Sequence, residues 1–327
     1  MKTRAIVFRR LNEPAIEQID LPEIGPGDVR VRTHYSGLSI GTESSIYSGR
    51  RTHNGTFPMV TGYMSTGVVE EVGSKVSDFK PGDSVVVNPS KLDGPVNSIW
   101  GAHMAMRVAS ADCVYRLPEN VDPVEASMFV MPRVGLNAAN MCGVGPEDVA
   151  IVIGQGLIGQ FFGQFARLRG ARTIAIEKNP LRIELAKKYV TPDVLNPDEC
   201  DVAARVNELA GDDHRVVVEA TGVEGPLEMA ASLFTPKCSM VYLAWHAGRI
   251  SIDFNTYHAN EVTSWYPMGS GGRETGIEVL DRLGDGSIKM TDNITDVLDV
   301  NDAPAGFRRI IEGDPNVMGM VFDWRDA

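Results

Sequence analysis

The sequence predicts an α/β protein in which a doubly wound parallel sheet is combined with a second, β-rich domain. From about Pro123, strand-like apolar runs and helical stretches alternate at the length of β-α-β units. Before that point, short β-type segments are separated by turn residues, and strand-like character returns beyond about residue 287. Two domains are also the natural expectation for 327 residues.

The β-rich part is expected to form an irregular barrel. Its strand-like segments are Arg4 to Phe8, Val29 to Thr33, Gly67 to Val72 and Ser84 to Val87. We assign the strand-like segment at 316–323 to the same domain, because a single added strand at a C-terminus usually completes a domain already begun. The predicted boundaries are therefore 1–122 with 287–327 for this discontinuous domain, and 123–286 for the other.

The second part is expected to alternate strands and helices. The predicted strands are 149–153, 172–177, 215–220, 238–244 and 261–266, and the predicted helices are 157–170, 180–189, 201–210, 224–234 and 273–284. This order is typical of a doubly wound parallel sheet.

Three glycines after the strand at 149–153 have the spacing G-x-G-x-x-G. Gly154 permits a tight turn, Gly156 lets a pyrophosphate approach the backbone, and Gly159 lets the following helix pack close to the strand. The pyrophosphate is then expected at the helix N-terminus, near Leu157 and Ile158, where unpaired N–H groups favour an anion. With a strand before it, a helix after it and a second strand ending on an acid, the motif predicts a Rossmann dinucleotide site.

The cofactor choice depends on Glu177, at the end of the second strand. Its carboxylate would accept hydrogen bonds from the adenine-side ribose and repel a 2′-phosphate, which favours NAD(H) over NADP(H). Lys178 stands beside it and would tolerate a phosphate, so NADP(H) stays open as the alternative. Ligands of open α/β sheets bind at the carboxyl ends of the strands, so we also expect contacts from Leu243, Ala244 and His246.

Charge and composition exclude several functions. The net charge of −12, with no Lys/Arg cluster longer than a pair, argues against nucleic acid and anionic lipid as partners. No apolar window is long enough for a membrane span or a signal peptide, so we expect a cytoplasmic protein. The cysteines lie far apart without a C-x-x-C pair, which argues against a disulfide framework or a cysteine-rich metal lobe: Cys113, Cys142, Cys200 and Cys238.

Along its whole length the chain resembles the medium-chain dehydrogenase/reductase superfamily. The resemblance rests on Glu13-Pro14, 26–29, 36–43, 62–69, Val72-Gly73, 81–83, the glycine motif and 219–222. It implies a GroES-like β-rich domain, a nicotinamide cofactor contacted also by Ala220, Thr221 and Gly222, and a small-molecule substrate. It further implies a homodimer or homotetramer.

The departures from that family concern its catalytic zinc. Zinc-dependent members carry a cysteine where this chain has Ser39 and Ile40, and Gly-His-Glu where it has Gly62-Tyr63-Met64. The third ligand would fall at 130–133, which contains no thiolate or carboxylate, and the four-cysteine lobe is missing. Because a catalytic zinc needs three N, S or O protein ligands, the comparison indicates a zinc-independent branch. There is a local similarity to the 3-hydroxyethyl bacteriochlorophyllide dehydrogenases, from which no substrate is assigned.

Without a metal, a side chain must stabilise charge on the substrate oxygen and handle its proton. Tyr63 occupies the place of a ligand histidine, so its hydroxyl is either proton donor or oxyanion stabiliser, or else a wall tyrosine bonded to backbone. Glu43 either orients Arg133, belongs to a proton relay, or forms a structural ion pair.

Three more residues of this region are candidates. Ser39 and Thr42 either bind the nicotinamide ribose or the substrate, or satisfy backbone at a turn. His53 lies in a segment that by family similarity borders the substrate site, where it is either an acid-base group or a solvated loop histidine.

The sequence thus favours a zinc-independent, NAD(H)-dependent oxidoreductase that interconverts an alcohol and a carbonyl. An enoyl or quinone reductase is the second hypothesis, and a cofactor-binding protein without turnover is the third.

Overall fold

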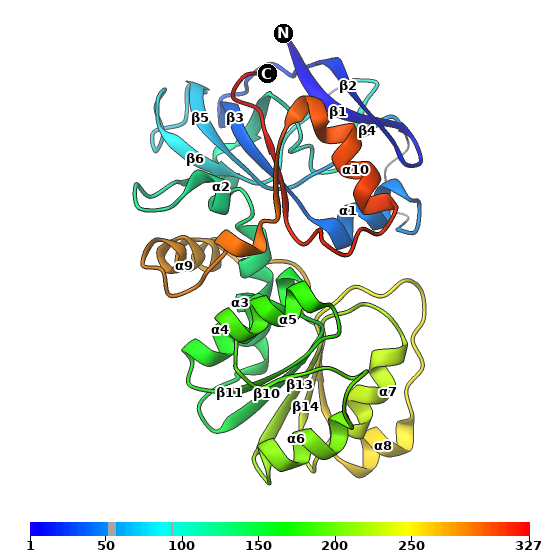
Figure 1. The fold of residues 1–327 in the computed structure, drawn as a ribbon. Helices are drawn as coiled ribbons and strands as arrows, with labels where there is room; N and C mark the ends of the chain where they lie inside the picture. Colours follow the sequence, from blue (N-terminus) through cyan, green and yellow to red (C-terminus); the bar gives the residue numbers. More distant parts are fainter. Residues whose placement is uncertain (52–56, 93) are drawn as a thin grey trace. The chain divides into compact units, whose positions relative to one another are not determined.

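The computed structural model describes residues 1–51, 57–92 and 94–327, and the chain divides into two compact units (Figure 1). Unit 1 contains Met1–Val130, Leu280–Asp285 and Met290–Ala327, and unit 2 contains Met131–Val279 and Gly286–Lys289. Unit 1 therefore extends beyond the predicted boundary at residue 122. That each unit folds as an independent domain stays a proposal.

Unit 2 is built on a parallel sheet with the strand order β12-β11-β10-β13-β14-β15 in the described residues, which is the Rossmann arrangement. The elements from Val130 onward are α3 (Val130–Cys142), β10 (Asp148–Ile153), α4 (Leu157–Leu168), β11 (Arg172–Ile176), α5 (Pro180–Tyr189), β12 (Val194–Leu195), α6 (Val202–Ala210), β13 (His214–Glu219), α7 (Gly225–Ser232), β14 (Ser239–Tyr242), α8 (Phe254–Ala259), β15 (Thr263–Trp265) and α9 (Arg273–Gly284).

Both faces of this sheet are covered by helices (Figure 1). Alternate residues of β10, such as Val149, Ile151 and Ile153, join one buried cluster with side chains of α6, α7 and α8. The intervening residues Ala150 and Val152 are also fully buried, on the face where α4 packs against β10 and β11. Because neither face meets water, the strand is a continuous apolar run rather than an alternating one.

The register of the sheet aligns the strand ends that matter for ligand binding. Ile153 at the end of β10 is paired with Ile176 of β11 on one side and with Glu219 of β13 on the other. The loops after these strands therefore start from one edge of the sheet.

Unit 1 contains two sheets of mostly antiparallel strands, with the orders β2-β1-β4-β7 and β16-β17-β3-β5-β6-β9 in the described residues, and β8 also pairs with β3. Its elements are β1 (Lys2–Arg10), β2 (Glu13–Asp20), β3 (Asp28–Leu38), α1 (Ile40–Tyr47), β4 (Met59–Val60), β5 (Ser65–Val72), β6 (Ser84–Val87), β7 (Asn97–Ser98), β8 (Met106–Ser110), β9 (Val114–Arg116), α2 (Pro123–Ala126), β16 (Asp296–Asp299), α10 (Ala303–Ile311) and β17 (Met320–Asp323), with short 3-10 turns at Ala111–Cys113, Thr291–Asn293 and Val300–Asp302.

The C-terminal segment differs from its expected strand-like character, because a helix, α10, lies between β16 and β17. Ala303, Phe307 and Ile310 share one buried face of this helix and pack into a core that also contains Phe8 and Phe322. The amphipathic spacing of these residues was overlooked in the sequence. β17 pairs with β3, so the last strand of the chain completes a sheet of unit 1.

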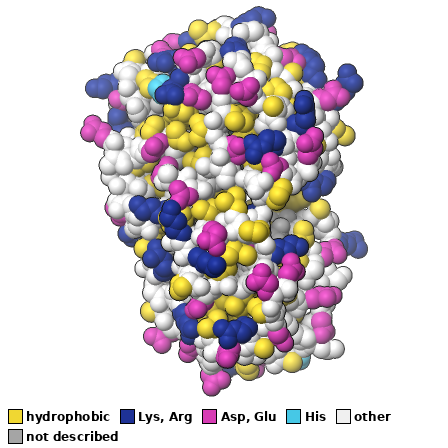
Figure 2. Space-filling model, in the orientation of Figure 1, with side chains coloured by type: hydrophobic (Ala, Val, Ile, Leu, Met, Phe, Trp, Pro, Cys, Tyr) yellow, Lys and Arg dark blue, Asp and Glu magenta, His cyan; other side chains and the backbone are white. Residues whose placement is uncertain are grey.

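Opposite charges are intermixed over the face of the molecule drawn in Figure 2, with no continuous field of one sign. Among the described residues, no helix combines the length and the apolar character that crossing a bilayer would require.

Arg107 is a charged residue inside the sheet core of unit 1. It lies on β8 opposite Val31 and has no exposed surface. One guanidinium nitrogen donates to the Ser65 hydroxyl, while Nε and the second terminal nitrogen have no hydrogen-bond partner in the described residues. Burial lowers the pKa of Arg107 to about 9. We therefore expect Arg107 to lower the stability of unit 1.

We predict that Arg107→Met stabilises the protein. Methionine fills a similar volume and removes a buried charge that has no carboxylate partner, a change expected to be worth about 1–4 kcal/mol. Thermal and urea unfolding of the two proteins measure the difference, with exposed Arg10→Met as the control for removing a charge. A lower melting temperature for Arg107→Met would show that the charge is compensated.

Candidate functional site

The glycine turn after β10 has the geometry that its spacing predicts. Gly154 adopts φ of +91°, and a Cβ there would lie 2.6 Å from Thr221 Cγ2. A Cβ on Gly159 would lie 2.1 Å from the Gly154 carbonyl oxygen. Gly156, the N-cap of α4, has no protein atom within 4 Å of its would-be Cβ. Two glycines thus permit close packing, and the middle one faces open space at a helix N-terminus.

Glu177 holds this turn in place. Its Oε2 accepts the Gln155 N–H at 2.8 Å, and its Oε1 accepts the N–H groups of Lys178 and Asn179 at 2.8 and 3.0 Å. The Arg182 guanidinium lies 3.9 Å from Oε2. The Lys178 side chain is exposed. Glu177 therefore has a structural role in addition to the ribose contact predicted for it.

A second buried acid, Glu219, organises the loops after β13 and β14. Its Oε1 accepts the N–H groups of Thr221 and Gly222 at 2.6 and 3.0 Å, together with the Thr221 hydroxyl. Its Oε2 is 2.8 Å from His246 Nε2. The backbone carbonyl of Glu219 accepts from the N–H groups of Leu243 and Ala244.

The structure therefore brings most of the predicted cofactor residues together at one edge of the sheet of unit 2. They are Gly154, Gly156, Leu157, Ile158, Gly159, Glu177, Lys178, Ala220, Thr221, Gly222, Leu243, Ala244 and His246. Thr42, also predicted to contact the cofactor, belongs to unit 1.

In unit 1, Tyr63 is surrounded by hydroxyl groups. The hydroxyls of Ser39 and Thr42 act on the Tyr63 hydroxyl as hydrogen-bonding groups and lower its pKa. Burial raises the pKa of Tyr63 to about 12, against the effect of these two hydrogen bonds and of Arg51, while the charge of Glu43 raises it further. Its ring meets the Trp100 ring edge-on at a centroid distance of 5.1 Å. The Tyr63 hydroxyl is thus a protonated hydrogen-bond donor at neutral pH.

Glu43 lies in the first turn of α1 and is fully buried. Its Oε1 accepts the Ser39 N–H at 2.9 Å, and its Oε2 accepts the Thr61 hydroxyl at 2.8 Å. The Arg133 guanidinium donates to the carbonyls of Gly271 and Gly272 and belongs to unit 2, so its orientation by Glu43 stays a hypothesis. No cation of an Arg or Lys side chain pairs with Glu43 in the described residues.

The third partner of Glu43 is a histidine that sequence reasoning missed. His103 Nε2 lies 2.9 Å from Glu43 Oε2, and both side chains are fully buried. His103 is sixty residues away from Glu43 in a segment without a motif, so the sequence pattern offered little to find it. Its one signal is that it is a histidine between apolar residues in Gly101-Ala102-His103-Met104. His53, predicted as a candidate acid-base residue, lies outside the described residues.

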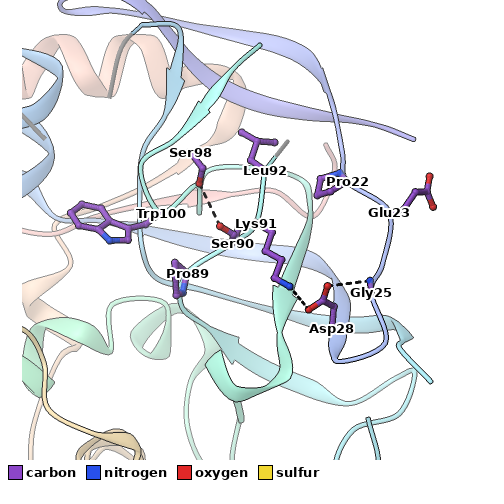
Figure 3. A pocket seen from close by; sticks show the side chains of 10 residues that line it. All are labelled: Pro22, Glu23, Gly25, Asp28, Pro89, Ser90, Lys91, Leu92, Ser98 and Trp100. Atoms are coloured by element: carbon purple, nitrogen blue, oxygen red, sulfur yellow. Dashed lines mark hydrogen bonds and ion pairs between the residues drawn. The ribbon is translucent and has the colours of Figure 1, made fainter. Parts of the chain in front are cut away.

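A cavity of about 560 Å³ opens in unit 1 beside these groups (Figure 3). It is lined by Pro22, Glu23, Gly25, Asp28, Pro89, Ser90, Lys91, Leu92, Ser98 and Trp100. Lys91 Nζ and Asp28 Oδ1 form an ion pair at 2.6 Å within it. None of the predicted site residues lines this cavity, but its wall includes Trp100, which packs against Tyr63.

The donor atoms around Tyr63 bear on metal binding. At the positions where zinc-dependent relatives supply ligands, the structure places the hydroxyls of Ser39 and Tyr63 and the buried thioether of Met64. In the described part of the chain, no three His, Cys, Asp or Glu side chains gather as a metal cluster would require. This donor set does not fit a catalytic zinc.

Two domain models match the chain. The alcohol dehydrogenase GroES-like domain matches residues 25–119, and the domain described as zinc-binding dehydrogenase matches residues 158–283. Together they span most of the chain in the order seen in the structure. The chain belongs to the medium-chain dehydrogenase/reductase superfamily. It is an oxidoreductase of that family.

Named relatives of this chain span nearly the same length. It is 25% identical to a probable D-xylulose reductase A from Aspergillus clavatus, over 94% of each chain. It is 28% identical to sorbitol dehydrogenase from Gallus gallus, over 71% of this chain and 72% of that protein. The structure of 2R,3R-butanediol dehydrogenase from Bacillus subtilis superposes with a TM-score of 0.85 at 23% identity, covering 98% of this chain and 99% of that one, and shows that the fold is shared.

For the glycine turn after β10 we predict that two alanine variants behave differently. Gly156→Ala should melt like wild type, since its Cβ meets open space, but bind NADH at least about 10-fold more weakly if a pyrophosphate approaches there. Gly159→Ala should lower the melting temperature, since its Cβ overlaps the Gly154 carbonyl. Thermal melts and NADH fluorescence titrations measure both. Unchanged NADH affinity in Gly156→Ala would show that the pyrophosphate does not bind at this turn.

Proposed function

We propose that this protein is a zinc-independent, NAD(H)-dependent oxidoreductase that interconverts an alcohol and a carbonyl by hydride transfer. The observation that carries the proposal is the hydroxyl cluster of Tyr63, Ser39 and Thr42. It occupies the position at which zinc-dependent relatives polarise the substrate oxygen with the metal.

A hydrogen-bond donor at this position performs part of the task of a Lewis acid. As a hydride reaches the carbonyl carbon, negative charge develops on oxygen, and a preorganised O–H group stabilises it. In the proposed reaction Tyr63 would donate its proton to the substrate oxygen, with the hydroxyls of Ser39 and Thr42 supporting the Tyr63 oxygen. With a pKa of about 12, Tyr63 is suited to hydrogen-bond donation rather than to ionisation near neutral pH.

The proposal of zinc independence rests on the donor chemistry. Hydroxyl and thioether groups replace the thiolate and imidazole ligands of zinc-dependent relatives. The buried His103 has both ring nitrogens engaged within the protein. The description of the matching family as zinc-binding makes the metal content an experiment of first importance.

The cofactor of the proposed reaction would be held by unit 2 and would supply the hydride when bound. Gly156 and the α4 N-terminus would receive the pyrophosphate, and Glu177 the adenine-side ribose. Glu177 already accepts three N–H groups, which fix the carboxylate at the end of β11. Its negative charge favours NAD(H) over NADP(H).

The substrate class is proposed from the relatives. The named proteins are a xylulose reductase, a sorbitol dehydrogenase and a butanediol dehydrogenase, so a small molecule with a hydroxyl or ketone group is the first candidate. A self-associated form is proposed as well, because the edge of the sheet after β15 exposes Tyr266 and Met268 at 63% and 81%.

The proposal is tested by assaying unsupplemented protein with NADH or NAD against matched panels of ketones, alcohols and enones, with the metal content measured on the same sample. We expect turnover of ketones or alcohols with far less than one zinc per chain. Turnover of enones alone would show that the protein is an enoyl or quinone reductase. Stoichiometric zinc in active protein would contradict the proposal that the enzyme is zinc-independent. Tight NADH binding without turnover would favour a binding protein.

For Tyr63→Phe we predict a fall in kcat of about 10²–10³-fold, the usual effect of losing one oxyanion donor, with little change in NADH affinity. Since the Tyr63 pKa is about 12, its ionisation should cause no loss of wild-type activity between pH 7 and 10. Kinetics of both proteins across that range measure this. An alkaline loss near pH 9 that disappears in Tyr63→Phe would contradict the assignment, as would wild-type kcat in the variant.

For Glu177→Ala we predict weaker NADH binding by about 1.5–3 kcal/mol, the value of a hydrogen bond to a charged group, and a smaller preference over NADPH. Comparing Kd for both cofactors gives the answer, with Glu184→Ala on the exposed side of α5 as the matched control. An unchanged ratio of the two Kd values would show that Glu177 serves only the glycine turn.

A further inference from the structure

A buried hydrogen-bond chain runs from the C-terminal strand to α1. Trp324 Nε1 lies 2.8 Å from Ser36 Oγ, Ser36 Oγ lies 2.8 Å from His103 Nδ1, and His103 Nε2 lies 2.9 Å from Glu43 Oε2. Each of these side chains is at most 2% exposed. These groups therefore have to satisfy one another without water.

The direction of this chain follows from its donors. An indole N–H can only donate, so Ser36 Oγ accepts at its end of the bond to Trp324. The single hydroxyl proton of Ser36 then goes to His103 Nδ1, which must carry a lone pair. His103 Nε2 consequently carries the proton and donates it to Glu43.

The reverse direction leaves a polar group unsatisfied. If Nδ1 carried a proton, Ser36 Oγ would accept from both Trp324 and His103, and its own hydroxyl proton would have no acceptor among the described residues. The same holds for a doubly protonated ring. Because an unpaired buried donor is disfavoured, the neutral Nε2–H form of His103 is selected.

At its far end, the chain reaches the hydroxyl cluster. The Ser39 N–H donates to Glu43, while the Ser39 hydroxyl acts on Tyr63 and lowers its pKa. Ser39 is the N-cap of α1, yet its side chain makes no cap hydrogen bond, so that hydroxyl is available to Tyr63. The position of Ser39 beside Tyr63 thus depends on a Glu43 carboxylate that is held in one orientation.

The His103 ring also touches the backbone that carries Tyr63. A Cβ on Gly62 would lie 2.7 Å from His103 Nε2 and Cδ2, and Gly62 has φ of +88°. The carbonyl of Gly62 accepts the Ala102 N–H at 2.9 Å. On another side, the ring meets Phe322 edge-on at a centroid distance of 5.5 Å.

We propose that His103 is a positioning residue, held as the neutral Nε2–H tautomer by the chain from Trp324 and Ser36, and that it fixes Glu43 and hence Ser39 beside the Tyr63 hydroxyl. Its catalytic consequence rests on the proposed function, whereas its tautomer and its effect on Tyr63 do not. His103 exchanges no proton with substrate.

The tautomer is measured directly by correlating ring protons with nitrogens in protein labelled with ¹⁵N-histidine at pH 8. His103→Gln identifies the His103 signals among those of the six histidines. We expect a protonated Nε2 and an unprotonated Nδ1. A proton on Nδ1, or on both nitrogens, would overturn the proposal.

The positioning role is tested with two substitutions. His103→Gln keeps an N–H donor for Glu43. His103→Phe keeps an aromatic ring at this position but removes both ring nitrogens. We expect kcat to fall about 10–100-fold in His103→Phe, the scale of a small displacement of a catalytic group, with KM for NADH within about 2-fold. His103→Gln should restore kcat to within about 3-fold of wild type. Equal kcat in wild type and His103→Phe, or no rescue by glutamine, would contradict positioning through Glu43.

The matched control is His214→Gln in unit 2, where an exposed histidine pairs with Asp148. It should leave kcat unchanged. Should wild-type protein turn over no alcohol or carbonyl, the proposed function fails, and the ring NMR signals of Tyr63 then decide the positioning role. We expect the Tyr63 signals to shift in His103→Phe and to stay in place in His214→Gln. Unshifted Tyr63 signals in both variants would refute the positioning role of His103.

Discussion

Two carboxylates without access to water determine how the candidate sites are built. Glu43 and Glu219 are both fully buried, and an ionised carboxylate in that environment is tolerated only when donors surround it. Glu43 is met by a backbone N–H, a hydroxyl and His103, and Glu219 by two N–H groups, a hydroxyl and His246. Each acid therefore fixes the loop whose groups it accepts, and those loops carry the predicted site residues.

The two sites nevertheless use different parts of the chain. In unit 2 the groups facing the expected cofactor are main-chain N–H groups at the start of α4, and close packing of Gly154 and Gly159 excludes side chains there. In unit 1 the cluster is made of the side-chain hydroxyls of Ser39, Thr42 and Tyr63. Main-chain binding suits a cofactor shared by a whole family, and side chains suit a substrate that differs among members.

The difference between a main-chain site in unit 2 and a side-chain site in unit 1 explains what could be predicted from the sequence. The glycine turn and helices such as α5 and α9 follow from local periodicity and turn chemistry, and their predicted ranges match closely. The helical spacing of Ala303, Phe307 and Ile310 was present in the sequence but overlooked, whereas the core that α10 joins with β1, α1 and β17 could not be foreseen from it. His103 could not be placed beside Glu43, because the two residues are sixty positions apart and only the tertiary fold of unit 1 brings them together.

The strength of the Tyr63 hydroxyl as a donor depends on the same burial that keeps it protonated. Removal from water raises its pKa to about 12, so proton release is unfavourable near neutral pH. In a medium of low dielectric constant, however, the O–H dipole interacts more strongly with a developing oxyanion than it would in water. Arg51 opposes the charge of Glu43 at this hydroxyl. Burial is nevertheless the largest effect on this hydroxyl, and the charges of Glu43 and Arg51 only adjust it in opposite directions.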